Sequence, residues 1–185
     1  MKSRTRVVWH ASPDRIANLC LSAATLEHGR SAGITSLENA LNKMHWLSEP
    51  ARAGVFQLAA DARGLASAAA ASGLMVIYID IGHAHDKEDF LDEASRAMRF
   101  PERFAGDWNA FAGGLKDLSW LRAKGWVVIL EKSKHFCGGH GHEFKEAMEP
   151  MLAAAEHWRG QGKPFWTLIG GPDGWKSGWP DMPSA

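Results

Sequence analysis

Three short apolar runs, rich in β-branched residues, constrain the fold of this chain more than any other feature of its sequence. They are Leu74 to Ile79, Trp126 to Leu130 and Phe165 to Ile169, and a glycine or proline directly precedes each of them. Continuous apolar runs of this length are typical of strands buried on both faces, as in parallel sheets. The sequence therefore predicts three parallel core strands, near residues 75–81, 126–131 and 165–169, and Val55 to Leu58 is a candidate for an extra edge element.

Segments with helical spacing separate the predicted strands. Ala59 to Ser72 is rich in Ala and Leu and ends at Gly73, and Asp86 is a candidate cap for a helix that ends before Pro101. Strands that alternate with helices imply a parallel sheet with right-handed crossovers. The predicted fold class is therefore α/β, a small three-stranded parallel sheet packed against about four helices. We expect these helices at residues 60–72, 86–99, 107–118 and 143–159.

Charge, cysteine content and hydropathy narrow the classes of function. Gly54 to Ala185 carries 14 Lys and Arg against 17 Asp and Glu, so no basic stripe suggests nucleic-acid binding, and a basic protein partner suits the chain better. Two cysteines are too few for a disulfide framework, which favours a reducing cytoplasm. The longest weakly polar run, Leu65 to Ile79, is shorter than the ~20 residues of a membrane span. We expect a cytoplasmic monomer without a membrane segment.

The N-terminal part of the chain differs in character from the rest. Sustained apolar periodicity is lacking there, which predicts a poorly ordered extension over residues 1–50. Two interpretations stay open: a flexible tail, or translated upstream sequence with Met44 as the true initiator. A domain over residues 54–170 follows, and the proline-containing residues 171–185 are expected to form an irregular tail.

The segment from Phe100 to Trp120 carries the most specific signal. It reads FPERFAGDWNAFAGGLKDLSW and resembles the central motif of the barstar family, approximately F-P-x-x-F-G-x-N-W-D-A-L-x-D-x-L-x-D-L-x-W. The similarity extends over about residues 54–170, because the three predicted core strands resemble those of the family in order and spacing. The resemblance implies a protein that performs no chemistry. The family's namesake binds a guanyl-specific ribonuclease inside the producing cell and blocks its active site.

The resemblance also implies where the partner binds, namely on the helix opened by this motif and on the loop before it. In this chain the corresponding residues are Phe104, Ala105, Gly106, Asp107, Asn109, Ala112, Gly113, Lys116 and Asp117. In the family, motif aspartates enter the cationic site of the ribonuclease in place of substrate phosphate. Here those two positions are Asn109 and Gly113, Ala105 replaces a glycine, and Asp107 stands where the motif has asparagine.

The carboxylate has in effect moved by two residues, which is about 200° around a helix and points it elsewhere. Asp117 stays on roughly the original face. The leading interpretation is thus a ribonuclease inhibitor whose specificity has diverged. The alternative is an immunity or antitoxin-type module that binds a protein other than a ribonuclease.

A glycine-rich segment from Ser133 to His142, expected to form a loop, holds a different kind of candidate. His135, Cys137, His140 and His142 are four potential ligands of a soft metal within eight residues. No second ligand pair accompanies them, so a mobile polar loop is the favoured interpretation. His83 and His85 follow a predicted strand and are interpreted as turn and surface residues. Since no nucleotide-binding, nucleophile or metalloprotease motif occurs, we expect no enzyme activity, no cofactor and no bound metal.

Overall fold

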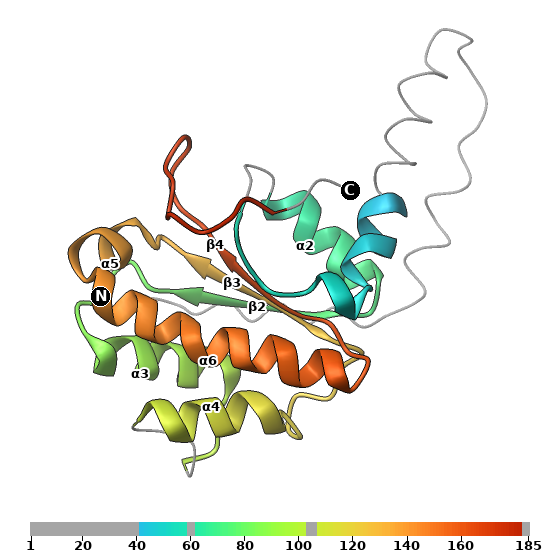
Figure 1. The fold of residues 1–185 in the computed structure, drawn as a ribbon, viewed down its shortest axis with the longest axis horizontal. Coiled ribbons are helices and arrows are strands. Elements are labelled where there is room, and N and C mark those ends of the chain that lie inside the picture. The colour runs from blue at the N-terminus through green and yellow to red at the C-terminus, as the bar shows by residue number, and fades with distance from the viewer. Residues whose placement is uncertain (1–40, 59–61, 103–106, 183–185) are drawn as a thin grey trace, which may run out of the picture.

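The structure, a computed structural model, describes residues 41–58, 62–102 and 107–182. At its centre lies a four-stranded parallel sheet with the strand order β1-β4-β3-β2 (Figure 1). The strands are β1 (Val55–Gln57), β2 (Met75–Asp80), β3 (Trp126–Glu131) and β4 (Phe165–Ile169). The α/β class and the parallel core predicted from the sequence are confirmed.

The predicted number of core strands is wrong by one, because the candidate edge element is a full member of the sheet. β1 pairs in parallel with β4, with Val55 opposite Thr167. Its three residues include the buried polar Gln57, whose side-chain Oε1 accepts a hydrogen bond from Ser177 N at 2.8 Å. A pattern this short and mixed does not define a strand by itself, so tertiary pairing decides it.

Five α-helices and one 3-10 helix complete the labelled elements in the described part of the chain. They are η3 (Pro50–Arg52), α2 (Ala62–Ala71), α3 (Lys87–Met98), α4 (Trp108–Asp117), α5 (Lys134–Gly139) and α6 (Gly141–Gly160). Helices α2, α3, α4 and α6 lie close to the four predicted ranges. None of the helices described has the length and hydropathy that crossing a bilayer requires.

Helix α5 lies where the sequence predicts a loop, and that prediction is wrong. Phe136 is fully buried and stacks on Phe90, with ring centroids 5.8 Å apart. Gly138 and Gly139 have low helix propensity. The burial of one aromatic side chain therefore holds this short helix against the local preference of its sequence.

The predicted ends of two helices are confirmed by their capping bonds. Asp86 caps α3, since its side chain accepts a hydrogen bond from Asp89 N at 2.9 Å. Helix α2 ends in a Schellman motif: Leu74 N donates to Ala69 O, and Gly73, at φ 78°, donates to Ala70 O, both at 3.0 Å. Only glycine adopts this left-handed conformation without strain, so Gly73 is a sequence-encoded helix stop.

Helices cover both faces of the sheet. The chain passes from β1 to β2 through α2 on one face, and it returns through α3, α4, α5 and α6 on the other face (Figure 1). Right-handed crossovers that run across a sheet in opposite directions must lie on opposite faces. In β3, Val127 and Ile129 therefore contact the α2 side, whereas Trp126, Val128 and Leu130 contact the side of α6.

Residues 41–52 lie on the α2 face of the sheet. Trp46 stacks on Trp166 with ring centroids 4.7 Å apart, and the indole Nε1 of Trp166 donates to Leu47 O at 2.9 Å. The side chains of Trp46 and Leu47 are buried. Trp46 and Leu47, within the predicted extension, thus belong to the packed core. Residues 1–40 lie outside the described residues, and the domain boundaries stay a prediction.

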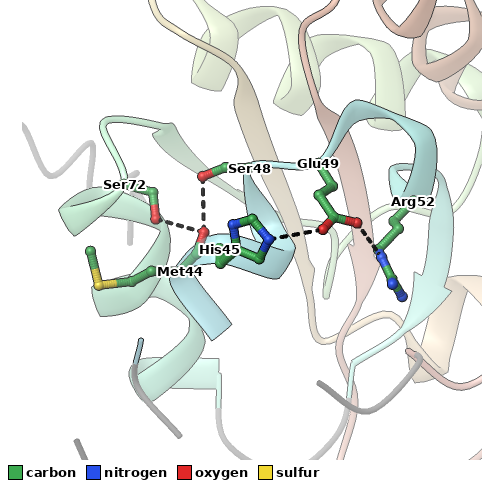
Figure 2. A network of polar contacts seen from close by, with 6 residues as sticks. All are labelled: Met44, His45, Ser48, Glu49, Arg52 and Ser72. Carbon is green, nitrogen blue, oxygen red and sulfur yellow. Dashed lines mark hydrogen bonds and ion pairs between the residues drawn. The ribbon is translucent and has the colours of Figure 1, made fainter. Parts of the chain in front are cut away.

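A network of polar contacts joins this N-terminal segment to α2 and to itself (Figure 2). The carbonyl oxygen of Met44 accepts hydrogen bonds from Ser72 Oγ at 3.2 Å and from Ser48 Oγ at 2.9 Å. Glu49 contacts His45 at 3.2 Å and also pairs with Arg52. The packing of Trp46 on Trp166 sets the position of this segment, and these mostly exposed polar contacts fix its orientation.

The C-terminal segment returns to the outer side of β1. Gln57 N donates to Pro180 O at 2.7 Å, and Met182 N donates to Gln57 O at 3.2 Å. Apart from this isolated bridge, residues 170–182 contain no regular helix or strand. The segment therefore covers part of an otherwise open sheet edge, which limits pairing with other chains.

We predict that Trp46→Ala lowers the free energy of unfolding by about 3 kcal/mol, because it removes a large buried ring and leaves a cavity against Trp166. Chemical denaturation of the full-length protein measures this loss. Leu41→Ala is the matched control in the same helical segment, residues 41–47, since Leu41 is 62% exposed, and it should change stability by less than about 0.5 kcal/mol. Equal stabilities of parent and Trp46→Ala would show that this segment does not contribute to the core.

Candidate functional site

Helix α4 lies outside the layer that covers the sheet. It packs beside α6 (Figure 1). Phe111 and Leu115 on its apolar side are fully buried. Leu115 O accepts a hydrogen bond from the indole Nε1 of Trp158 at 2.8 Å. The opposite side of α4 faces solvent, so this helix is presented on a rigid support.

Gly114 allows a close approach on the buried side of α4. A Cβ atom built there would lie 2.6 Å from Cε2 of Phe100, far inside van der Waals contact. Sequence reasoning did not single out this glycine, although two adjacent glycines within a helix are a signal of close packing. Gly114 thus fixes how the start of the motif, Phe100, packs against its helix.

Asp107 caps α4. Its backbone is extended, at φ −149° and ψ 167°, and its side-chain Oδ1 accepts a hydrogen bond from Ala110 N at 2.8 Å. An N-cap aspartate accepts a hydrogen bond from one of the free N–H groups of the first turn, and its negative charge interacts favourably with the positive end of the helix dipole. The carboxylate at the asparagine position of the motif therefore has a local structural role.

The predicted partner-binding residues that the structure describes all lie on α4 or at its cap. Asp107, Asn109 and Lys116 are exposed, and Ala112, Gly113 and Asp117 are half-buried. Phe104, Ala105 and Gly106 lie outside the described residues. The structure thus places the six described residues along α4 and at its cap. Their role in binding a partner stays a prediction.

We predict that Asp107→Ala destabilises the protein by about 1 kcal/mol, because the first turn of α4 loses its capping acceptor. Asp107→Asn is the matched control: it removes the charge but keeps a good capping oxygen, so it should retain most of the stability. Urea denaturation of both variants measures the difference. If both lose the same free energy, the charge of Asp107 and not its capping bond stabilises the helix.

A second group of polar residues lies at the carboxyl edge of the sheet. Asp80 at the end of β2 pairs with Lys132, which follows β3, and its Oδ1 accepts a hydrogen bond from Gly82 N at 3.0 Å. Partial burial alone would raise the pKa of Asp80, but the bonds from Lys132 and Gly82 outweigh it and lower that pKa. The same pairing raises the pKa of Lys132.

We predict that Asp80→Asn lowers stability at neutral pH by at most about 1 kcal/mol, because Lys132 is largely exposed and solvent screens the pair. Since the folded state lowers the pKa of Asp80, this contribution is present above the unfolded pKa of about 4 and is lost at lower pH. Because the pKa of Lys132 is raised, the pair would lose the charge of the lysine only in strong alkali. Unfolding of parent and variant between acid and neutral pH measures the effect, and a difference that persists at acid pH would contradict the assignment.

Histidines from the loop before α3 and from the α5 region meet at the same edge. His85, which precedes α3, lies beside His135 and His140 of the α5 region, and one potential ligand atom of each falls within 4.8 Å of the others. Cys137 instead donates its thiol to Ser177 O at 3.6 Å, and His142 contacts Glu146 at 3.7 Å. Of the four soft ligands named from the sequence, the structure joins only two in this cluster, together with a histidine from another loop.

Cys137 is a free thiol within the described part of the chain. Partial burial raises its pKa, so the thiolate form that binds metals is disfavoured. An open cleft of about 860 Å³ lies beside this cluster. It is lined by His135, the two glycines of α5, Lys132, Lys134 and Pro172, among other residues. The carboxyl edge of a parallel sheet is where α/β proteins commonly place ligands.

These features define a class: a small α/β domain whose parallel sheet is covered on both faces and which presents one capped helix to solvent. The sequence profile of the family described as Barstar (barnase inhibitor) matches residues 74–170, just over half of the chain. The chain belongs to the barstar family. The resemblance seen in the sequence is therefore confirmed, and the family is one of inhibitors.

Other comparisons add little. A comparison with curated proteins gives no match. Among solved structures, the Aeropyrum pernix ORC2 protein in ADPNP–ADP complexes has a TM-score of 0.41 and 14% identity, over 82% of this chain and 43% of that chain. Cdc6p from Pyrobaculum aerophilum has a TM-score of 0.38 and 15% identity, over 88% of this chain and 44% of that chain. This chain spans less than half the length of either protein, and similarities this low carry no argument.

Proposed function

We propose that this protein is a cytoplasmic, monomeric inhibitor that binds a ribonuclease through α4 and the residues just before it and so occludes the active site. One observation carries the proposal. The chain belongs to a family of barnase inhibitors, and the helix that holds the family's central motif exposes the face on which the motif's aspartates would stand. No catalytic step by this protein is required.

The support of α4 favours a role in tight binding. A hydrogen bond caps the helix at Asp107, Phe111 and Leu115 anchor it, and Gly114 packs closely on Phe100. A surface held in one conformation loses little entropy when a partner binds. Helix α4 therefore offers a preorganised contact surface even though its exposed residues differ from the family's pattern.

The charge of that surface argues for a diverged specificity. Asn109 and Gly113 place no carboxylate where the motif has two aspartates. If such carboxylates fill a cationic pocket, their absence leaves the Arg and Lys groups of the target desolvated without a counter-charge, which costs several kcal/mol. A ribonuclease of the barnase type should thus bind this protein weakly.

The same loss of acid favours a second candidate function. An immunity or antitoxin-type module would keep the fold and use the same helix for a target whose site is less cationic. Lys116, exposed near the end of α4, adds a positive charge to that surface. The two candidates differ in whether restored acid improves ribonuclease binding.

The experiment measures inhibition of a barnase-type ribonuclease by the full-length protein, with a fluorogenic RNA substrate. We predict weak inhibition by the parent and at least tenfold tighter binding by Asn109→Asp/Gly113→Asp, about 1.4 kcal/mol. The gain should shrink as salt rises, since it depends on exposed charges.

A control variant separates local complementarity from net charge. Asn42→Asp/Ser67→Asp adds the same two charges at exposed positions on the other face of the sheet. It should leave inhibition within about twofold of the parent, because distant exposed charges are screened. If neither the parent nor the α4 double variant binds the ribonuclease, the proposal fails and the antitoxin-type alternative takes its place.

A further inference from the structure

Three histidines from two segments converge at the carboxyl edge of the sheet: His85 on the loop after β2, and His135 and His140 on α5 and at its end. Nδ1 of His85 lies 3.2 Å from Nε2 of His135. One ring nitrogen from each of His85, His135 and His140 lies within 4.8 Å of the other two. The ring centroids of His140 lie 6.1 Å from His85 and 6.0 Å from His135. The inhibitor function assigned to α4 uses none of these side chains.

The loop that carries His85 is held on both sides. Ala84, before it, is buried, and Asp86, after it, caps α3. The backbone N–H of His85 donates to Oδ2 of Asp89 at 3.0 Å. The histidine thus stands on an ordered turn between a core residue and a helix cap.

The other two histidines depend on α5. Phe136, fully buried, stacks on the ring of His140 with centroids 6.1 Å apart and an angle of 29° between the planes. His140 is also the junction between α5 and α6, where Phe144 N donates to its carbonyl oxygen at 2.9 Å. Packing therefore restrains the ring of His140, while the exposed rings of His85 and His135 are free to adjust.

The distance between His85 and His135 has two chemical explanations. Two neutral imidazole nitrogens 3.2 Å apart share one proton in an N–H···N bond, or both lone pairs bind one cation. Zinc–nitrogen bonds of 2.0–2.1 Å in tetrahedral geometry place neighbouring nitrogens about 3.3 Å apart. The pair therefore already has the separation of two ligands on one zinc ion, and small side-chain rotations would bring in the third.

We propose that His85, His135 and His140 bind one divalent cation of borderline softness, with Zn²⁺ as the best fit. Three imidazoles without a carboxylate suit Zn²⁺, Cu²⁺ and Ni²⁺ and disfavour Mg²⁺ and Ca²⁺, which require oxygen ligands. The exposure of His85 and His135 leaves a fourth position open to water. The bound ion would join the loop after β2 to the junction of α5 and α6.

Isothermal titration of the full-length, tag-free and chelator-treated protein with Zn²⁺ tests this. One ion should bind per chain, and Mg²⁺ should not bind. Each of His85→Gln, His135→Gln and His140→Gln should weaken the affinity by about tenfold or more. His142→Gln is the matched control two residues from His140, and its affinity should stay within about twofold of the parent, since His142 faces Glu146.

A second readout distinguishes loss of a ligand from loss of fold. Without metal, the exposed His85→Gln and His135→Gln variants should melt at the temperature of the parent. With Zn²⁺ in about 100-fold excess over its dissociation constant, the parent's Tm should rise by about 5 °C and theirs should not. The proposal is overturned if the parent binds no Zn²⁺, if the three variants bind it as tightly as the parent, or if His142→Gln weakens binding equally.

Discussion

The architecture depends on β3, which pairs in parallel with β2 on one side and with β4 on the other. Its first five residues are buried, with alternate side chains in the two core clusters. A strand in this position exposes apolar surface on both faces, so helices are required above and below it. The same pairing places the carboxyl ends of β2 and β3 at one edge, which decides which loops can meet.

The crossover between β2 and β3 contains two helices, and this explains why α4 is a surface helix. Helix α3 contacts β2, whereas the apolar side of α4 packs on α6. The other side of α4 then has no core to fill. Positions such as Asn109 can vary there at little cost to stability, while Phe111 and Leu115 remain fully buried. This separation lets the exposed side of α4 change in sequence while the buried side keeps the fold.

Sequence reasoning reached part of the candidate sites and missed the rest for a geometric reason. Asp107 was recognised as a displaced carboxylate, and its capping bond follows from local geometry. The four candidate ligands named from the sequence lie within one segment, but α5 is helical, so side chains close together in this segment point in different directions. Cys137 is two residues from His135, about 200° around a helix, and it points toward Ser177 instead. The side chain beside His135 is instead that of His85, which lies 50 residues earlier in the chain.

The sequence by itself determined the three core strands, the four longer helices and two of their ends, because burial patterns and capping bonds act between residues close along the chain. Gly73 and Asp86 are examples, each with partners within five residues. Only the tertiary structure decided that β1 joins the sheet, that α5 is helical and that three histidines meet. It also decided that the indole N–H of Trp166 donates to the carbonyl oxygen of Leu47, 119 residues away. Such contacts depend on how the crossovers fold the chain over the sheet, and no local pattern encodes that arrangement.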